Sequence, residues 1–365
     1  MFYLGEFGLD RKDQHVGLAN QQYSTTPAKD FTETLFVHHS LPQTKVDEVD
    51  ISTSVAGLDF AFPFFINAMT GGSKKTREIN RLLGIMGHFG KIALASGSVS
   101  AAIKDPSVAE TFSVMRRENP YGIIFANLGA HHSVENAKRA VDLLEANAIQ
   151  IHVNAPQEIV MPEGDRDFTM WLKNIETLVR EMEVPVIVKE VGFGMSRETV
   201  AQLASVGVKT IDVSGTGGTD FAKIENARRT FNDYAYLEGW GQSTVTSLVE
   251  AMSVPEEVRP SLIASGGIKT PLDIVKSLAL GADLVGMSNH FLQYVKDGKG
   301  HRFDDGLQAI NTFQWQMAEI MTMLGAKNIA ELRQKDLVLA PNVQNWCEAR
   351  GIDWKAYARR SQLVK

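Results

Sequence analysis

Residues 185–215 read PVIVKEVGFGMSRETVAQLASVGVKTIDVSG and contain one complete strand–helix–strand unit. An apolar, β-branched run, Pro185–Val191, comes first, and an amphipathic helical pattern follows at Ser196–Val206. A second apolar run begins at Thr210 and ends at Gly215. Because parallel strands need a crossover connection such as this helix, the stretch predicts an α/β fold built on a parallel sheet.

The same unit recurs along the chain from Phe64 onward. The candidate strands are Phe64–Met69, Lys91–Ser96, Gly122–Gly129, Ile149–Asn154, Pro185–Val191, Thr210–Gly215, Ser261–Gly267 and Leu284–Ser288. The clearest helical patterns are Pro106–Glu118, His132–Asn147, Phe168–Met182, Ser196–Val206, Thr270–Leu280 and Leu307–Leu324. Eight such units are the number in a (β/α)8 TIM barrel, and a doubly wound open sheet is the competing architecture.

Polar residues at the carboxyl ends of the candidate strands favour the barrel, because barrel enzymes build their sites on that rim. These residues are Asn67, Ser98, Asn127, Asn154, Lys189, Ser214 and Ser288. We therefore predict a barrel over residues 61–326. An N-terminal extension, 1–60, precedes the barrel and is a candidate contributor to the substrate site, and a helical C-terminal extension covers 327–365.

Composition excludes several classes of protein. With 44% hydrophobic and 22% charged residues among 365, the chain is an ordinary globular protein. Its net charge of −6, with both signs scattered, gives no basic footprint for nucleic acid. No apolar run reaches the ~18 residues needed to span a bilayer. A single cysteine, Cys347, and no visible secretory signal lead us to expect a cytoplasmic protein.

The fourth candidate strand carries an unusual set of polar residues. Alternation along the strand places Gln150, His152 and Asn154 toward the barrel interior, where branched apolar residues are the norm. Gln157 and Glu158 follow in the adjoining loop. A hydrogen-bonded polar core pair would explain one such residue, but the convergence of several indicates a ligand site.

Three glycine-containing loops predict a phosphate site. Ser214-Gly-Thr-Gly-Gly-Thr219 follows the sixth strand, Ser265-Gly-Gly-Ile268 the seventh and Gly286-Met-Ser-Asn289 the eighth. Glycine permits tight turns whose exposed N–H groups bind anions. The loops after strands seven and eight form the common phosphate site of these barrels, so we expect a phosphorylated ligand there.

Two basic features leave several interpretations open. Lys189 could be a strand-end lysine that reaches solvent, a Schiff-base lysine, or a cation that stabilises an anionic cofactor. The cluster Arg11-Lys-Asp-Gln-His15 could be a solvated surface patch, or it could fold over the rim and neutralise a diphosphate.

Taken together, the motifs resemble those of the FMN-dependent type 2 isopentenyl-diphosphate isomerases. The resemblance rests on Arg11-Lys-x-x-His15, Ala68-Met-Thr-Gly-Gly72, Ser96-Gly-Ser98, Asn127-Leu-Gly129, His152-Val-Asn-x-x-Gln-Glu158, Val188-Lys-Glu-Val-Gly192 and Ser214-Gly-x-Gly-Gly-Thr219. It runs in order from residue 11 to about residue 292, which is roughly three quarters of the chain. The chain departs from the family at Ser288-Asn-His-Phe291, where many relatives have Ala followed by a basic residue and proline.

The resemblance implies a 1,3-allylic proton shift between isopentenyl and dimethylallyl diphosphate. It also implies FMN in its reduced form, NADPH as the flavin reductant, Mg²⁺ and a homo-oligomer, either a tetramer or an octamer. Gln157, His152 and Asn154 would serve catalysis, and Glu158 would hold the metal. Substrate would contact Arg11, Lys12, His15, Ser98 and Gln157. FMN would contact Ala68, Met69, Thr70, Ser98, Asn127, Lys189, Ser214, Thr219, Gly266, Gly267, Lys269, Ser288 and Asn289.

Three other functions compete with this interpretation. An FMN barrel oxidoreductase acting on a hydroxy acid or dihydro compound would need a rim His or Tyr as base and an Arg clamp for a carboxylate. A Schiff-base aldolase built on Lys189 would contain no flavin. A non-catalytic phosphate-binding barrel would not need so polar a fourth strand.

Overall fold

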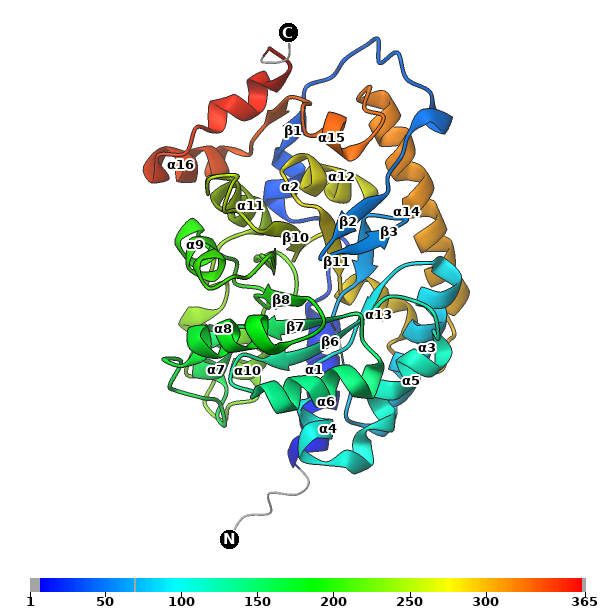
Figure 1. Cartoon of the computed structure of the whole chain (residues 1–365), viewed down its shortest axis with the longest axis vertical. Helices are drawn as coiled ribbons and strands as arrows, with labels where there is room; N and C mark the ends of the chain where they lie inside the picture. Colours follow the sequence, from blue (N-terminus) through cyan, green and yellow to red (C-terminus); the bar gives the residue numbers. More distant parts are fainter. Residues whose placement is uncertain (1–6, 69, 363–365) are drawn as a thin grey trace.

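A closed barrel of eight parallel strands forms the centre of the molecule. The computed structural model describes residues 7–68 and 70–362, without the side chains of residues 7–11. The strands are β4 (Phe64–Ile66), β5 (Leu94–Ala95), β6 (Ile124–Gly129), β7 (Ala148–His152), β8 (Val186–Lys189), β9 (Thr210–Asp212), β10 (Ser261–Ser265) and β11 (Leu284–Met287). They pair in chain order, and β11 closes on β4. Figure 1 shows the labelled strands β6, β7, β8, β10 and β11 in the middle of the molecule. The predicted (β/α)8 barrel is confirmed, and the open sheet is wrong.

Helices surround the barrel and connect its strands. They are α3 (Lys74–Gly90), α5 (Glu110–Glu118), α6 (Val134–Leu144), α8 (Trp171–Glu181), α9 (Arg197–Ser205), α11 (Thr244–Met252), α12 (Pro271–Ala279) and α14 (Phe303–Met323). Several begin at a hydroxyl N-cap, for example Ser73, Ser133, Ser196 and Thr270. Three shorter helices, α4 (Ser100–Lys104), α7 (Ala155–Val160) and α10 (Phe221–Ala227), lie in the loops after the strands, and α13 (Asn289–Val295) follows β11.

Alternation along the strands separates two apolar clusters. Ile149 and Ile151 of β7 point outward and pack in the large cluster that includes helix residues such as Ala140 and Leu178. Inside the barrel, a smaller cluster contains Phe65, Phe125, Ile187, Ile263 and Leu284. The hairpin of β2 (Thr53–Val55) and β3 (Leu58–Phe60) adds Val55 and Phe60 to this interior cluster. Its apolar packing supports the polar layer that lies nearer the carboxyl ends of the strands.

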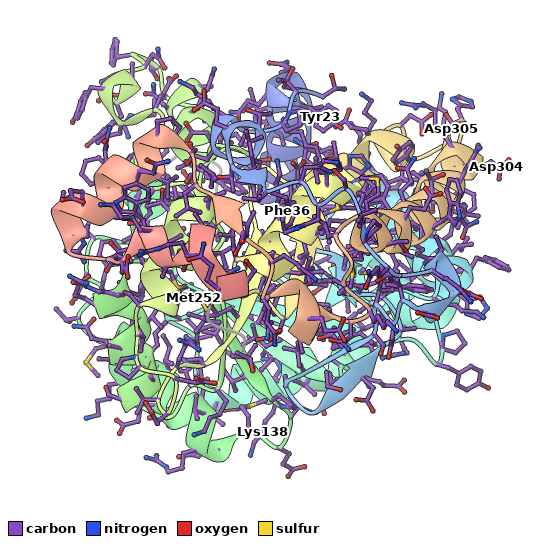
Figure 2. All side chains as sticks on the ribbon, turned by 90° about the horizontal axis from the view of Figure 1, so that it is seen from above. Tyr23, Phe36, Lys138, Met252, Asp304 and Asp305 are labelled. Carbon is purple, nitrogen blue, oxygen red and sulfur yellow. The ribbon has the colours of Figure 1, made fainter. Side chains whose placement is uncertain are left out.

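The segments before and after the barrel meet each other. Helix α1 (Phe7–Gln22) comes first, followed by α2 (Lys29–Glu33), β1 (Leu35–Phe36) and a 3-10 turn at Val46–Glu48. After the barrel come α15 (Ile329–Leu332), β12 (Leu337–Val338), α16 (Pro341–Arg350) and a kinked 3-10 segment at Trp354–Gln362. Strand β1 pairs antiparallel with β12, and Phe36, labelled in Figure 2, lies opposite Leu337. The proposed domain boundaries at residues 60 and 326 remain predictions.

Two smaller differences from the expected elements have local causes. The expected helix Pro106–Glu118 is a 3-10 turn, Pro106–Val108, followed by α5, because Asp105 caps the turn at the Ser107 N–H. Every barrel strand except β6 also ends one to three residues earlier than expected, since the chain turns into the rim loops. None of the described helices is long and apolar enough to cross a membrane.

Candidate active site

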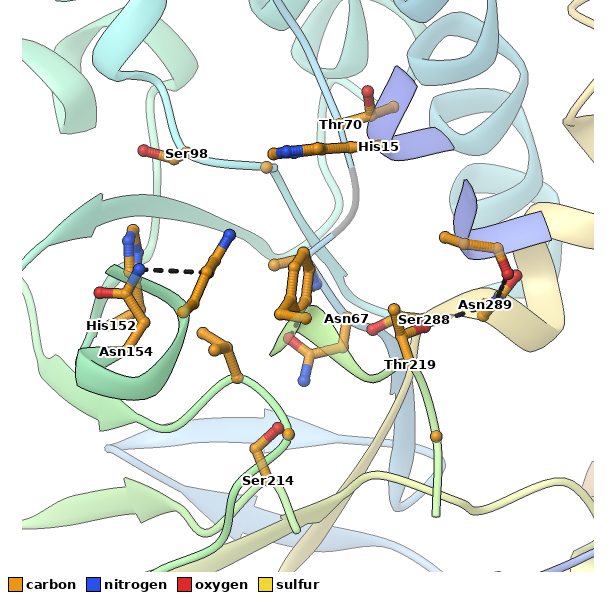
Figure 3. A pocket seen from close by; sticks show the side chains of 18 of the residues that line it. His15, Asn67, Thr70, Ser98, His152, Asn154, Ser214, Thr219, Ser288 and Asn289 are labelled. Carbon is orange, nitrogen blue, oxygen red and sulfur yellow. Dashed lines mark hydrogen bonds between the residues drawn. The ribbon is translucent and has the colours of Figure 1, made fainter. Parts of the chain in front are cut away.

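A cavity of about 1160 Å³ opens at the carboxyl ends of the barrel strands. It is lined by the described site residues that the sequence predicted, which are Lys12, His15, Ala68, Thr70, Ser98, Asn127, His152, Asn154, Gln157, Glu158, Lys189, Ser214, Thr219, Gly266, Gly267, Lys269, Ser288 and Asn289. Met69 and the side chain of Arg11 lie outside the described residues. Figure 3 shows His152 and Asn154 on one side of this pocket, with Thr219, Ser288 and Asn289 on the other.

A hydrogen-bonded polar layer forms the floor of the cavity. Asp212 accepts hydrogen bonds from Ser265 Oγ at 2.7 Å and from Asn67 Nδ2 at 2.8 Å. Gln150 Nε2 donates to Asn67 Oδ1 at 3.0 Å, and Asn127 Nδ2 donates to Gln150 Oε1 at 3.1 Å. His152 Nδ1 lies 2.9 Å from Asn127 Oδ1 at the far end. Buried polar groups are costly unless paired, so this satisfied chain explains how the barrel tolerates them.

Lys189 brings a positive charge into this floor. The side chain is buried at the end of β8, and its Nζ donates to the carbonyl oxygen of Glu190. Burial lowers the pKa of Lys189, and the nearby Asp212 and Glu190 carboxyls oppose that shift. The Glu190 carboxyl is itself buried, which raises its pKa to about 7, although it accepts hydrogen bonds from the backbone N–H groups of Val191 and Phe193.

Glycines let the loops after β9 and β10 pack backbone against backbone. Gly217, Gly266 and Gly267 have φ angles of 105°, 96° and 75°, which favour glycine. A Cβ on Gly266 would lie 2.0 Å from the Gly215 carbonyl oxygen, and one on Gly218 would lie 2.9 Å from the Gly267 nitrogen. The result is a narrow backbone cradle on the Thr219 side of the cavity.

The N-terminal segment covers this cradle. Asn289 Nδ2 donates to the Ala19 carbonyl oxygen at 2.7 Å, and it lies 3.4 Å from Thr219 Oγ1. Lys269 Nζ donates to the carbonyl oxygen of Thr26, and burial lowers its pKa. Residues before the barrel therefore close the cradle side of the cavity. The contribution of the N-terminal extension to a substrate site remains a prediction.

A second set of polar groups occupies the side of His152. Asn154 Nδ2 donates to Gln157 Oε1 at 3.1 Å and to Glu158 Oε1 at 2.9 Å. Gln157 Nε2 donates to Glu225 Oε1 at 2.8 Å, so its carboxamide is held at both ends. The backbone N–H of Asp165 binds the other oxygen of Glu158 at 2.9 Å. Asn154, Gln157 and Glu158 thus form one oriented cluster.

Glu225 anchors that cluster to helix α1. Its carboxylate lies 3.1 Å from His15 Nε2 and pairs with Arg228. Burial alone would raise the pKa of Glu225, but the adjacent His15 ring, the hydrogen bond from Gln157 and the Arg228 charge hold it at about 2. Burial lowers the pKa of His15, and the Glu225 carboxylate opposes that shift.

A basic wall completes the cavity near Ser98. Ser98 Oγ lies 2.9 Å from Ser100 Oγ, which lies 2.7 Å from His132 Nε2. Burial lowers the pKa of His132 to about 4. Lys12 and Lys104 line the same cavity. Among the described residues, no group of three or more His, Cys, Asp or Glu side chains could hold a metal ion alone.

Sequence reasoning missed Asp212, Glu225, Arg228, Ser100 and His132. Asp212 could have been predicted, because the alternation applied to the fourth strand also places it inside the barrel. Glu225 and Arg228 are three residues apart on α10 and its C-cap, a spacing that brings charged side chains together on a helix. Nothing in the local pattern identifies Ser100 or His132, since their pairing joins different loops.

Comparison with known proteins places this geometry in a family. A family model described as FMN-dependent dehydrogenase matches residues 122–339. Among solved structures, a flavocytochrome b2 variant with sulfite bound superposes with a TM-score of 0.60 at 20% identity, over 87% of this chain and 81% of that chain. A mandelate oxidase variant with an FMN monooxide adduct superposes with a TM-score of 0.60 at 14% identity, over 92% and 97%. These two likenesses concern the fold alone.

Relatives of higher identity carry a single name, isopentenyl-diphosphate delta-isomerase. The protein of Staphylococcus haemolyticus is 49% identical over 343 residues, which is 94% of this chain and 97% of the relative. A Staphylococcus aureus protein is 49% identical over 344 residues, with the same coverage. A Staphylococcus epidermidis protein is 48% identical over 342 residues, or 94% and 96%. The chain therefore belongs to the isopentenyl-diphosphate delta-isomerase family, whose isomerase activity is carried here on an FMN-dependent dehydrogenase barrel.

Proposed function

We propose that the chain interconverts isopentenyl and dimethylallyl diphosphate by a 1,3-allylic proton shift that uses reduced FMN and Mg²⁺. The observation that supports this most is the two-sided cavity. A glycine cradle suited to one phosphate lies beside Thr219, and a basic wall with the oriented Glu158 carboxylate lies beyond His152. A cofactor phosphate and a substrate diphosphate can therefore occupy opposite ends of one pocket.

The cradle fits an FMN phosphate. A Cβ at Gly266 or Gly218 would approach neighbouring backbone atoms too closely, so the two loops can pack this tightly only with glycine at both positions. Loops of this kind, placed after the last strands of a barrel, present backbone N–H groups to a phosphate. Thr70 Oγ1 lines the cavity, is buried and has no hydrogen-bond partner within the described structure, so it is available to a ligand.

Reduced FMN, when bound, would supply the proton donor and acceptor that an unactivated alkene requires. Lys189 would then place its positive charge beside the electron-rich part of the flavin and favour the anionic reduced form by Coulomb attraction. NADPH is the reductant that we infer for this flavin. The allylic shift leaves the oxidation level of the substrate unchanged, so one reduction should serve many turnovers.

The residues beyond His152 would bind and orient the substrate. Glu158 is held by Asn154 and the Asp165 N–H, and it would bind Mg²⁺ together with diphosphate oxygens. Mg²⁺ commonly uses one or two carboxylates with substrate phosphates, which suits a site without a cluster of protein ligands. Lys12 and Arg11 would neutralise the remaining charge. Gln157, fixed between Asn154 and Glu225, would orient the hydrocarbon end and exclude water.

One anaerobic experiment tests this function. FMN-loaded protein, reduced once by dithionite or NADPH, should convert isopentenyl to dimethylallyl diphosphate over many turnovers while the flavin stays reduced. In deuterated water, label should enter the product. Gln157→Ala should slow the exchange while FMN stays bound.

Two other reactions give different outcomes in that experiment. One equivalent of reductant consumed per product would falsify the isomerase reaction and support an oxidoreductase, the function suggested by the dehydrogenase family model. Colourless protein that forms a borohydride-trapped adduct on Lys189 would instead support the aldolase.

A further inference from the structure

The polar layer inside the barrel is a directional chain that ends at His152. Three carboxamides, those of Asn67, Gln150 and Asn127, connect Asp212 to this histidine. Each carboxamide has one donor end and one acceptor end, so the orientation of one constrains the next. The orientation of the Asn67 carboxamide therefore constrains the hydrogen bonding of His152 at the other end of the series.

The first carboxamide is oriented by two independent neighbours. The backbone N–H of Ala68 can only donate, and it lies 2.8 Å from Asn67 Oδ1. The carboxylate of Asp212 accepts at 2.8 Å from Asn67 Nδ2, while its other oxygen accepts from Ser265 Oγ and the Ser214 N–H. Reversing Asn67 would place an NH2 group against the Ala68 N–H and an oxygen against the carboxylate.

The orientation then passes through the barrel. Because Asn67 presents Oδ1, Gln150 must approach with Nε2 and present Oε1 to the next residue. Asn127 must then donate with Nδ2, which leaves its Oδ1 facing His152 at 2.9 Å. An oxygen that only accepts demands a donor on Nδ1. Gln150 is fully buried, so no solvent competes for either end of its carboxamide.

We propose that this interior chain fixes His152 as the Nδ1–H tautomer and presents its Nε2 to the cavity as a hydrogen-bond acceptor. In this arrangement Asn67, Gln150 and Asn127 are positioning residues that act through His152. Burial and the neighbouring Lys189 charge lower the pKa of His152 well below its usual range, which keeps the ring neutral. The hydrogen bond made by one ring nitrogen determines the state of the other.

The tautomer limits what His152 can bind. A lone pair on Nε2 accepts from an N–H or O–H group, such as a flavin ring N–H, a ribityl hydroxyl or a metal-bound water. It cannot donate to a bare phosphate oxygen. The inference concerns the resting protein and does not depend on the isomerase reaction.

Solid-state ¹⁵N NMR of FMN-loaded, histidine-labelled protein without substrate tests this proposal. The His152 resonances are assigned by their loss in His152→Gln. We expect a pyrrole-type signal from Nδ1 and a pyridine-type signal from Nε2, at neutral pH. A pyrrole-type Nε2, or two protonated nitrogens, would overturn the proposal, and the assigned wild-type spectrum can show either.

Two variants separate the chain from general packing. Gln150→Met keeps the length of a side chain that does not line the cavity but removes both hydrogen bonds, so Asn127 can reverse. The Nδ1–H form should then fall from nearly the whole population to a mixture with the Nε2–H form. Ser265→Ala removes a buried hydroxyl that binds Asp212 on a side branch, so the tautomer should not change. The proposal would be contradicted if folded Gln150→Met kept the wild-type His152 tautomer. It would also be contradicted if Ser265→Ala gave the same mixture of His152 tautomers as Gln150→Met.

Discussion

Lys189 is buried at the floor of the cavity, with the Asp212 carboxyl nearby. In the proposed function this cation favours negative charge on a bound flavin. Lys189→Met keeps the length of the side chain and removes the charge. The midpoint potential of bound FMN should fall, because the anionic reduced form loses Coulomb stabilisation. Potentiometric titration of the bound flavin checks this, and a potential equal to that of the wild type would place the cation elsewhere.

Glu158 is the carboxylate that we expect to bind Mg²⁺ with the substrate. Glu158→Gln preserves size and removes the charge, and the loss of a charge-assisted contact is worth about 1.5–3 kcal/mol, a factor of roughly 10 to 100 in affinity. The Mg²⁺ concentration for half-maximal activity should rise accordingly. Asp165→Asn is the matched control, because it changes a neighbouring cavity carboxylate and leaves the Asp165 N–H bound to Glu158. If Asp165→Asn raises the Mg²⁺ concentration for half-maximal activity more than Glu158→Gln does, then Glu158 is not the main protein ligand of the metal.

The glycine cradle is a property of two loops rather than of one residue. Gly218→Ala adds a Cβ that would lie 2.9 Å from the Gly267 nitrogen, so the loops after β9 and β10 must separate. We expect FMN to bind at least about tenfold more weakly, equal to roughly 1.4 kcal/mol, as measured by the recovery of free-flavin fluorescence on dilution. Gly17→Ala in α1 is the control, because its Cβ meets nothing within 4 Å. Equal flavin affinity in both variants would mean that the phosphate lies elsewhere.

Elements with a strong period were predictable from the sequence. The eight strands and the long helices follow from apolar runs and amphipathic repeats, and each was found close to its expected position. The short helices α4, α7 and α10 have five to seven residues, too few to show a helical period. Glu225 was missed for that reason, and Ser100 was missed because its partner, His132, belongs to another loop. Gln150, His152 and Lys189 were found because a polar residue inside a barrel stands out against the apolar norm.

At the scale of the whole molecule, a buried glutamate attaches the C-terminal extension to the barrel. Glu250 of α11 is fully buried and accepts hydrogen bonds from Trp346 Nε1 at 2.7 Å and Arg350 Nε at 2.8 Å. Arg350→Ala leaves this buried carboxylate without its charged partner, which should lower the free energy of unfolding by clearly more than a surface substitution does. Urea denaturation measures the loss. Arg359→Ala, which alters an exposed side chain in the same extension, should stay within about 0.5 kcal/mol of the wild type.

The same ion pair predicts a pH dependence of stability. Burial alone would raise the pKa of Glu250, but Arg350, the Arg197 N–H and Trp346 outweigh it and lower the pKa. A carboxyl whose pKa falls on folding stabilises the native state above its ordinary pKa, and the contribution disappears as pH falls through the native value. The difference between wild type and Arg350→Ala should therefore narrow in acid. If the difference in unfolding free energy between wild type and Arg350→Ala stayed constant down to the pH at which the protein unfolds in acid, this explanation would be wrong.

The pairing of β1 with β12 joins two segments that leave the ribosome at very different times. Thr34 Oγ1 accepts from the Ala340 N–H, and these residues are 306 positions apart in the chain. At translation rates of about 5–20 residues per second, the early strand exists for roughly 15–60 s before its partner emerges. During that interval Leu35 and Phe36 lack the partner strand with which they pair in the folded protein. The two strands can pair only once translation has passed residue 338, and an unpaired strand edge is a general site for association with other chains.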